Sequence, residues 1–210
     1  MLTLGVLISG SGTNLQAILD AIASGELHAK VGVVISNVPG AKGLARAEAA
    51  GVPTKVIDHR AYAERRGFDG ALAMALRASG VEWVVLAGFM RVVTPVLLDA
   101  FPSRVLNVHP ALLPAFPGMH APRQAVAYGV RVAGCTVHLV DAGTDTGPIV
   151  AQAAVHVFQG DDEATLAARI LAAEHVLLPE VLQWIAEGRV SIAPPQAPGE
   201  RARVDVKAAR

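Results

Sequence analysis

Two polar side chains near the middle of the chain have the types and the spacing for polar chemistry. Asn107 and His109 lie two residues apart in the run Val105–His109, whose valine and leucine residues predict a short buried strand. Alternate side chains of a strand project from the same face, and Pro110 ends this strand because a prolyl nitrogen cannot donate to a sheet ladder. An amide and an imidazole are therefore expected at the C-terminal end of a strand, where open α/β sheets bind ligands. A purely structural role for both groups is the alternative.

A glycine-rich turn near the start of the chain predicts an anion site. The turn, Ser9-Gly10-Ser11-Gly12-Thr13-Asn14, lies between an apolar run typical of a buried strand and a segment with helical spacing. Glycines let the backbone approach a ligand closely, and the unpaired amides of a helix N-terminus attract a phosphate. Thr13 or Asn14 is expected to cap the helix. Leu15 occupies the third glycine position of the dinucleotide fingerprint, which argues against NAD. A turn without any ligand is the alternative.

A third segment of interest, Gly88–Val93, follows a predicted strand. An apolar loop with one arginine, Arg91, could clasp a flat heterocycle, although Phe89 and Met90 could instead belong to the core. The arginines that precede this segment are interpreted as surface residues, and one of them could hold a carboxylate ligand. They are Arg60, Arg65 and Arg66.

These segments are positioned by an alternation of predicted strands and helices. Strands are expected at residues 4–8, 31–35, 54–57, 83–87, 105–108, 132–140 and 149–157. Helices are expected at residues 15–22, 43–50, 68–79, 94–100, 120–128 and 163–187, of which Pro179 could interrupt the last. The pattern predicts the α/β class: an open, twisted, mostly parallel, Rossmann-like sheet with helices on both faces and an antiparallel strand in the C-terminal half.

The last two predicted strands are joined by the turn-rich loop 141–148, and we expect them to pair antiparallel. The loop contains two carboxylates, of which Asp141 is interpreted as an ordinary turn residue. The fold is expected to end at Ala193-Pro194-Pro195. We expect residues 1–190 to form a single domain and residues 191–210 to be a C-terminal tail that is mobile or forms edge structure.

Composition restricts the class of protein. The 210 residues are 52% hydrophobic, and 18 Lys and Arg residues balance 18 Asp and Glu residues, which argues against a nucleic-acid partner. Cys135 is the only cysteine, so disulfides and a thiolate metal cluster are excluded, and we expect it to be buried in a strand. The N-terminus has no basic region of a signal peptide, and no apolar run approaches the ~20 residues of a spanning helix. We expect a soluble cytoplasmic protein that does not bind membranes.

Three motifs together resemble one family. Ser9–Asn14, Asn107–Pro114 and Asp145–Pro148 occur in this order, and with them the chain resembles the phosphoribosylglycinamide formyltransferases, folate-dependent enzymes of purine biosynthesis. The resemblance covers residues 1 to about 190. Relatives that formylate methionyl-tRNA or hydrolyse formyl-folate share the Asn, His and Asp but carry an additional domain, so the glycine turn and the chain length favour the glycinamide enzyme.

The resemblance implies an activity and its participants. A formyl group would pass from 10-formyltetrahydrofolate, a co-substrate, to 5-phosphoribosylglycinamide, without a metal. The partners would be these small molecules, and the protein would be a monomer or a homodimer. The N-terminal half, to about residue 100, would bind the phosphate, and the C-terminal half would bind folate and catalyse transfer. The alternatives are a formyltetrahydrofolate hydrolase and a non-catalytic module that binds a phosphorylated metabolite.

The resemblance also implies roles for individual residues. The catalytic residues would be Asn107, His109 and Asp145. The substrate-binding residues would be Gly12, Thr13 and Asn14 at the ribose phosphate and Glu174 near the ribose. The residues that contact folate would be Arg65, Met90, Arg91, Val92, Val93 and Asn107. Ala111 stands where the family usually has serine, which puts one loop hydrogen bond in doubt.

Elementary chemistry agrees with these roles. Attack of the amine on the formyl carbon creates a tetrahedral oxyanion, to which the Asn107 amide and a protonated His109 are suitable donors. An ionised Asp145 beside the ring would favour its charged form and hold its orientation. His109, Asp145 or an ordered water could carry the proton from the attacking nitrogen to the folate nitrogen. We also expect the Leu113–Pro114 peptide to be cis.

Overall fold

Strands and helices alternate through the first half of the chain. The computed structural model describes residues 1–193 and 202–208, and the chain divides into two units, Met1–Asn107 and Val108–Arg210. The strands of the first unit are β1 (Leu2–Ile8), β2 (Ala29–Ser36), β3 (Thr54–Val56), β4 (Trp83–Leu86) and the start of β5 (Val105–His109). Its helices are α1 (Thr13–Ser24), α2 (Lys42–Ala49), α3 (Arg65–Ala78) and α4 (Pro95–Ala100), with a 3-10 turn at His59–Ala61.

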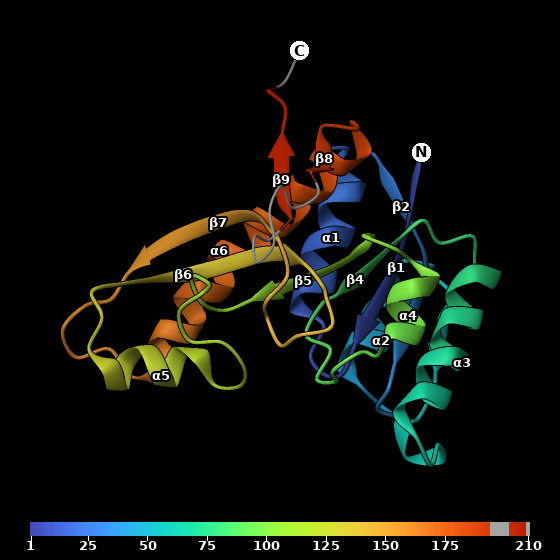
Figure 1. Cartoon of the computed structure of the whole chain (residues 1–210), viewed down its shortest axis with the longest axis horizontal. Coiled ribbons are helices and arrows are strands. Elements are labelled where there is room, and N and C mark those ends of the chain that lie inside the picture. Colours follow the sequence, from blue (N-terminus) through green and yellow to red (C-terminus); the bar gives the residue numbers. More distant parts are fainter. Residues whose placement is uncertain (194–201, 209–210) are drawn as a thin grey trace. The chain divides into compact units, whose positions relative to one another are not determined.

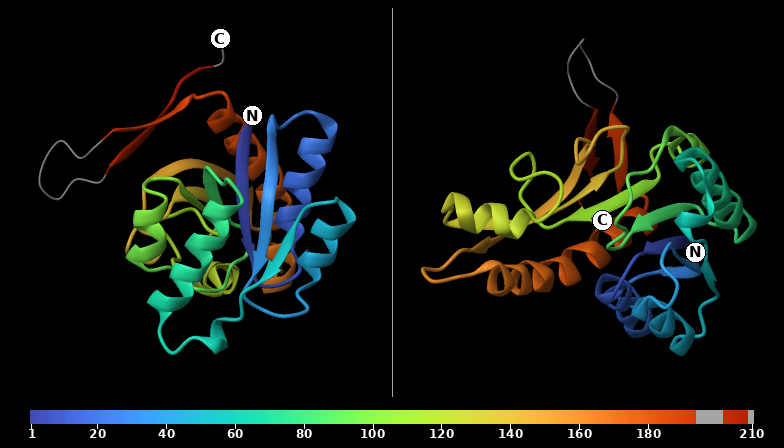
Figure 2. Two further views of the ribbon diagram at one scale, coloured as in Figure 1. Left: turned by 90° about the vertical axis from the view of Figure 1, so that its right-hand side faces the viewer. Right: turned by 90° about the horizontal axis from the view of Figure 1, so that it is seen from below.

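The first unit is a parallel sheet with helices on both faces. Its strands pair in the order β3-β2-β1-β4-β5, and every pair is parallel. Figure 2 shows α1 and α2 against one face of these strands and α3 and α4 against the other. β1 and β4 consist almost entirely of buried apolar residues because both of their faces are covered. The loops that follow β1 and β4, and Asn107 on β5, therefore lie at the C-terminal edge of this sheet.

The second unit contains the end of β5 and an antiparallel pair. Its helices are α5 (Ala121–Tyr128) and α6 (Glu163–Ala186), and its strands are β6 (Val132–Leu139), β7 (Ile149–His156), β8 (Val190–Ala193) and β9 (Arg203–Val206). β6 and β7 pair antiparallel, and α6 packs along both of them (Figure 1). The predicted α/β class, with a mostly parallel sheet, helices on both faces and an antiparallel strand in the C-terminal half, is confirmed. The single-domain organisation stays a prediction.

Three local expectations need correction. α1 is preceded by Gly12 in the left-handed conformation, with no side-chain cap, so neither Thr13 nor Asn14 caps it. α6 continues through Pro179, because the residues around it, such as Leu178 and Leu182, are buried against the strands and this packing outweighs one lost backbone bond. Beyond Ala193 the chain forms a further strand, β9, which pairs antiparallel with β8. The predicted end at Pro194-Pro195 lies outside the described residues.

No helix in the described part of the chain is both long enough and apolar enough to cross a membrane.

Two glycines should respond in opposite directions to the same substitution. A Cβ at Gly134 on β6 would lie 2.0 Å from the Ala153 carbonyl oxygen, whereas a Cβ at Gly67 in α3 would make only ordinary contact at 3.6 Å. Gly134→Ala should lower the free energy of unfolding by roughly 1–3 kcal/mol. Gly67→Ala should raise it by about 0.5–1 kcal/mol, because alanine favours helix. Urea denaturation of both variants measures the difference, and equal effects would contradict the register of β6 on β7.

Candidate active site

His109 and Asp145 meet in the second unit, as expected from the sequence. His109 is the last residue of β5 and is 5% exposed. The loop between β6 and β7 brings Asp145 to it, with 3.3 Å between His109 Nδ1 and Asp145 Oδ2. The other ring nitrogen, Nε2, lies 2.9 Å from the Phe116 carbonyl oxygen. Both ring nitrogens therefore face oxygen acceptors, and an imidazolium can donate to both of them.

A second histidine, which the sequence reasoning missed, contacts the same carboxylate. His138 lies near the end of β6, is 2% exposed, and has its Nε2 atom 3.6 Å from Asp145 Oδ1. Its Nδ1 atom lies 2.9 Å from the Leu139 carbonyl oxygen. The sequence did contain a signal, because His138, like His109, is a polar residue near the end of an apolar strand that leads into a loop. Asp145 thus lies between two buried imidazoles.

Asp145 has an unusual backbone conformation and a lowered pKa. Its φ of 54° is in the left-handed region, which aspartate tolerates better than most residues. The Gly118 N–H donates to Asp145 Oδ2 over 2.8 Å. Burial acts to raise the pKa of the carboxyl, but His138, the Gly118 amide and the charge of His109 together hold the pKa below its ordinary value of 3.8. The carboxylate is therefore ionised at neutral pH.

Side chains of the antiparallel pair hold the loop that follows His109. The Leu113 N–H donates to Thr136 Oγ1 over 3.0 Å, and Thr136 Oγ1 donates to the Ala111 carbonyl oxygen over 2.7 Å. Gln152, which pairs with Thr136 across β6 and β7, donates to the Leu113 carbonyl oxygen over 2.9 Å. The Leu113–Pro114 peptide is cis, which confirms that prediction. The main chain at Ala111 is thus held although its side chain carries no hydroxyl.

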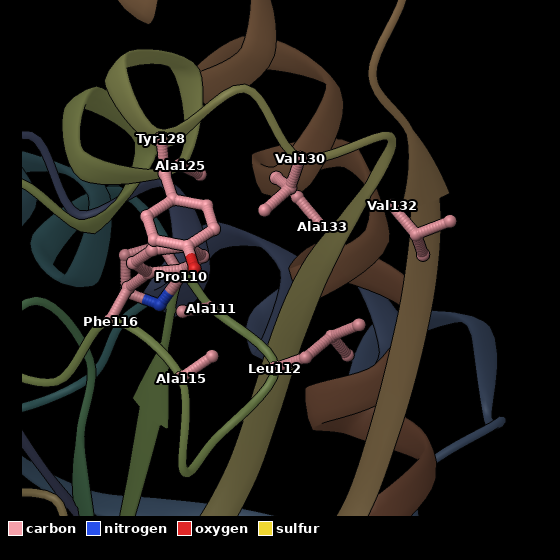
Figure 3. Close-up of a pocket in the computed structure, with 10 residues that line it drawn as sticks. All are labelled: Pro110, Ala111, Leu112, Ala115, Phe116, Ala125, Tyr128, Val130, Val132 and Ala133. Carbon is pink, nitrogen blue, oxygen red and sulfur yellow. The ribbon is translucent and has the colours of Figure 1, made fainter.

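An apolar pocket of about 450 Å³ is lined by residues of this loop together with residues of α5 and β6 (Figure 3). The ring of Tyr128, from α5, meets that of Phe116 edge to face with 5.8 Å between centroids. The lining residues are Pro110, Ala111, Leu112, Ala115, Phe116, Ala125, Tyr128, Val130, Val132 and Ala133. Their side chains are apolar except for the Tyr128 hydroxyl. This pocket therefore has few groups with which to recognise a phosphate or a formyl group.

Glu174 lies on α6 and is 5% exposed. Burial and the charge of Glu174 raise the pKa of the Cys135 thiol on β6 to about 12, so this cysteine is a neutral thiol. Cys135 is fully buried, as expected of structural sulfur. Glu174 is a buried carboxylate and so needs compensation by other groups.

In the first unit, the glycine turn lines a small pocket of about 180 Å³. The lining residues are Ser9, Gly10, Ser11, Gly12, Thr13, Asn14, Ala87, Gly88 and Met90. Gly12 has a φ of 69°, and a Cβ there would lie 2.5 Å from the Cα of Gly43 on α2. Glycine is therefore required at position 12 both by the backbone angle and by the close approach of α2. The turn and the loop after β4 share one pocket.

The loop after β4 separates core residues from exposed ones. Phe89 is buried and stacks on Phe68 of α3 with 6.4 Å between ring centroids, so it belongs to the core. Met90 is 70% exposed and Val92 is 50% exposed, whereas Val93 is buried. Arg91 is half-buried, and Arg65 is exposed at the start of α3. Asn107 pairs in register with Leu86, directly before this loop. Met90, Arg91 and Val92 can thus offer their side chains to a ligand.

The lowered pKa of Asp145 predicts how stability depends on acid. A depressed folded-state pKa stabilises the protein above the unfolded value of 3.8, and this stabilisation is lost as the pH falls through the folded value. Asp145→Asn should therefore reduce the free energy of unfolding at about pH 7 and reduce it much less at about pH 3. Urea denaturation of both proteins across this range gives the difference. A difference independent of pH would contradict the ionised, histidine-bound carboxylate.

Comparison with known proteins agrees with this geometry. The sequence profile of the formyl transferase family matches residues 3–182. The chain is 42% identical to the phosphoribosylglycinamide formyltransferase of Escherichia coli, over 89% of this chain and 88% of that protein. It is 46% identical to the trifunctional purine biosynthetic protein adenosine-3 of Drosophila melanogaster, over 90% of this chain. The chain spans only 14–19% of the length of the trifunctional proteins that it matches.

A solved structure shows the same likeness. The glycinamide ribonucleotide transformylase 1 of Symbiobacterium toebii superimposes with a TM-score of 0.93 at 54% identity, over 98% of this chain and 94% of that one. The family profile covers both units, including the segments that carry Asn107, His109 and Asp145. The chain belongs to the formyl transferase family.

Proposed function

We propose that this chain transfers the formyl group of 10-formyltetrahydrofolate to the amine of 5-phosphoribosylglycinamide, a step of purine biosynthesis. The observation that carries the proposal is the contact of Asp145 with the buried His109 at the end of β5, with Asn107 two residues before His109 on the same strand. Family membership and the names of the similar proteins support it. The proposed participants are two small molecules, without a metal ion.

The first unit supplies the proposed phosphate site. The helix that begins at Thr13 presents its N-terminal amides to the pocket of the glycine turn, where they can donate to phosphate oxygens. Arg46 of α2 adds a positive charge beside the turn, since its Nε atom donates to the Ser11 carbonyl oxygen over 2.9 Å. Gly12, Thr13 and Asn14 are the proposed phosphate contacts. Glu174, in the second unit, is the proposed contact of the ribose.

Folate is proposed to bind the loop after β4. The exposed side chains of Met90 and Val92 provide apolar contact for a flat heterocycle, and Val93 can contribute only its backbone because its side chain is buried. Arg91 and Arg65 carry the positive charge suited to the carboxylates of folate. Asn107, in register with the end of β4, is proposed to contact the folate as well as the reacting centre.

The proposed chemistry needs a donor and a proton path. The amine nitrogen attacks the formyl carbon, the carbonyl becomes an oxyanion, and collapse breaks the bond to N10 of the folate. The Asn107 amide and His109 Nε2–H donate to the oxyanion. In the structure His109 Nε2 lies within hydrogen-bond distance of the Phe116 carbonyl oxygen. The oxyanion therefore has to replace this carbonyl as the acceptor of the Nε2–H bond. The attacking nitrogen loses one proton and N10 gains one, with His109, Asp145 or water as carrier.

One assay separates this proposal from its alternatives. The protein is given 10-formyltetrahydrofolate with and without 5-phosphoribosylglycinamide, and the formylated product and free formate are both quantified. Formylated product that requires both substrates supports the transferase. Formate released without the amine would identify a hydrolase instead, and binding without turnover would identify a non-catalytic module.

The two catalytic groups should act as one unit. His109→Asn and Asp145→Asn should each lower kcat by roughly 10²–10³, because either change removes a charged donor or its orientation. The double variant should be only slightly worse than the worse single variant. Asp141→Asn is the control, since an amide oxygen can still accept the bonds from Thr146 and Gly143. Losses that multiply in full would show that the two groups act independently.

The glycine turn should govern only the phosphorylated substrate. Gly12→Asp places a negative charge and a side chain in the turn, so the KM for 5-phosphoribosylglycinamide should rise more than the KM for 10-formyltetrahydrofolate. Ala23→Asp, at the exposed far end of α1, introduces the same charge away from the turn and should change neither KM. An unchanged affinity of Gly12→Asp for the phosphorylated substrate, measured by calorimetry, would remove the phosphate site from this turn.

A further inference from the structure

The loop between β4 and α4 has no regular secondary structure, although it presents two exposed apolar side chains, Met90 and Val92. A loop that must be ordered when its ligand arrives loses affinity through the entropy of that ordering. The contacts that hold its backbone before the ligand binds are therefore part of its binding function.

Two side chains from other elements bind the backbone of this loop. At its start, the Met90 N–H donates to Ser9 Oγ over 2.8 Å, and Ser9 Oγ donates to Asn37 Oδ1 over 2.6 Å. At its end, the Thr94 N–H donates to the carboxylate of Asp69 on α3. Thr94 directly precedes α4, and α3 and α4 lie side by side (Figure 1). The backbone is thus held at Met90 and at Thr94, the two ends of the segment that contains the exposed side chains.

The carboxyl group at position 69 is buried, and burial disfavours its ionised form. Asp69 is 1% exposed, and burial raises the pKa of its carboxyl, against the lowering effects of the bonds from Thr94 and the charges of Arg91 and Arg65. A carboxyl with a raised folded-state pKa stabilises the fold below its unfolded value of 3.8, and this contribution is lost as the pH rises through the raised value. Burial of the group therefore disfavours the ionised form of the carboxyl. A neutral asparagine would avoid this cost, but its amide oxygen would accept the Thr94 bond more weakly than a carboxylate does.

A contribution to stability therefore does not explain why position 69 carries a carboxyl group. Its bond to the backbone of the loop between β4 and α4 does. Arg91 lies within the loop, and its charge acts on Asp69. We infer that Asp69 is a positioning residue for the loop Met90–Val93, which holds the Thr94 end of the loop before folate binds. The inference rests on the proposed function, since it assigns a purpose to the proposed folate loop.

The test compares Asp69→Asn with Glu82→Gln. Glu82 is a matched control because its carboxylate also accepts a backbone bond, from the Thr3 N–H over 2.9 Å, but at the opposite edge of the sheet from the loop. Asp69→Asn should raise the KM for 10-formyltetrahydrofolate roughly tenfold, the effect of one weakened charged hydrogen bond. The KM for 5-phosphoribosylglycinamide should stay within about twofold, and Glu82→Gln should change neither constant.

Stability provides a second measurement, which a merely structural role would move in the other direction. The urea midpoint of Asp69→Asn at neutral pH should equal or exceed that of the unchanged protein. A lower midpoint together with equal rises of both KM values would show that Asp69 only supports the fold. A folate KM unchanged by Asp69→Asn would also overturn the inference.

Amide hydrogen exchange tests the positioning without any substrate. The Thr94 N–H should exchange measurably faster in Asp69→Asn than in the unchanged protein, while the Thr3 N–H is unaffected. If the unchanged protein does not transfer formyl groups, the proposed function fails, and the exchange at Thr94 still decides whether Asp69 holds the loop. Equal exchange at Thr94 in both proteins would refute that hold.

Discussion

The negative charge of Asp145, whose side chain is only 12% exposed, is the constraint on which the candidate active site depends. A carboxylate removed from water needs compensation by donors and opposite charges. Here two imidazoles and one backbone amide supply it, from β5, β6 and the loop after His109. These three segments must therefore stay together for the carboxylate to be ionised while it is largely removed from water. The contact with Asp145 also orients His109. The same arrangement therefore compensates the charge of Asp145 and positions the imidazole for the proposed reaction.

The chain uses buried carboxylates in two opposite ways. The pKa of Asp145 is lowered because its partners outweigh its burial, whereas the pKa of Asp69 is raised because burial outweighs its partners. Its partners therefore favour the ionised form of the first carboxyl, and burial disfavours the ionised form of the second. The presence of a carboxyl at position 69 is therefore explained more readily by the loop that Asp69 holds than by the apolar core around it. Both groups hold irregular backbone next to residues proposed to meet a ligand.

Regular elements hold the irregular ones throughout the molecule by bonds from side chains to main chain. Thr136 and Gln152 do this for the loop after β5, and Asp69 does it for the loop after β4. Strands and helices are stiff because their own backbone bonds are complete, so a side chain on them is a well-fixed donor or acceptor. Such loops can combine the exposure that binding needs with the precise position that chemistry needs.

The sequence by itself determined the elements and the first candidates for chemistry. Apolar runs, helical spacing and the breakers glycine and proline are local patterns, so they located the strands, the helices and the polar pair of Asn107 and His109 at a strand end. Family resemblance added Asp145. Only the tertiary structure revealed the contacts of His138 and Asp69, since His138 meets Asp145 where the loop after β6 turns back on its strand and Asp69 binds a residue 25 positions away. Which buried polar groups meet depends on how the strands and loops pack, and a local sequence pattern does not specify that packing.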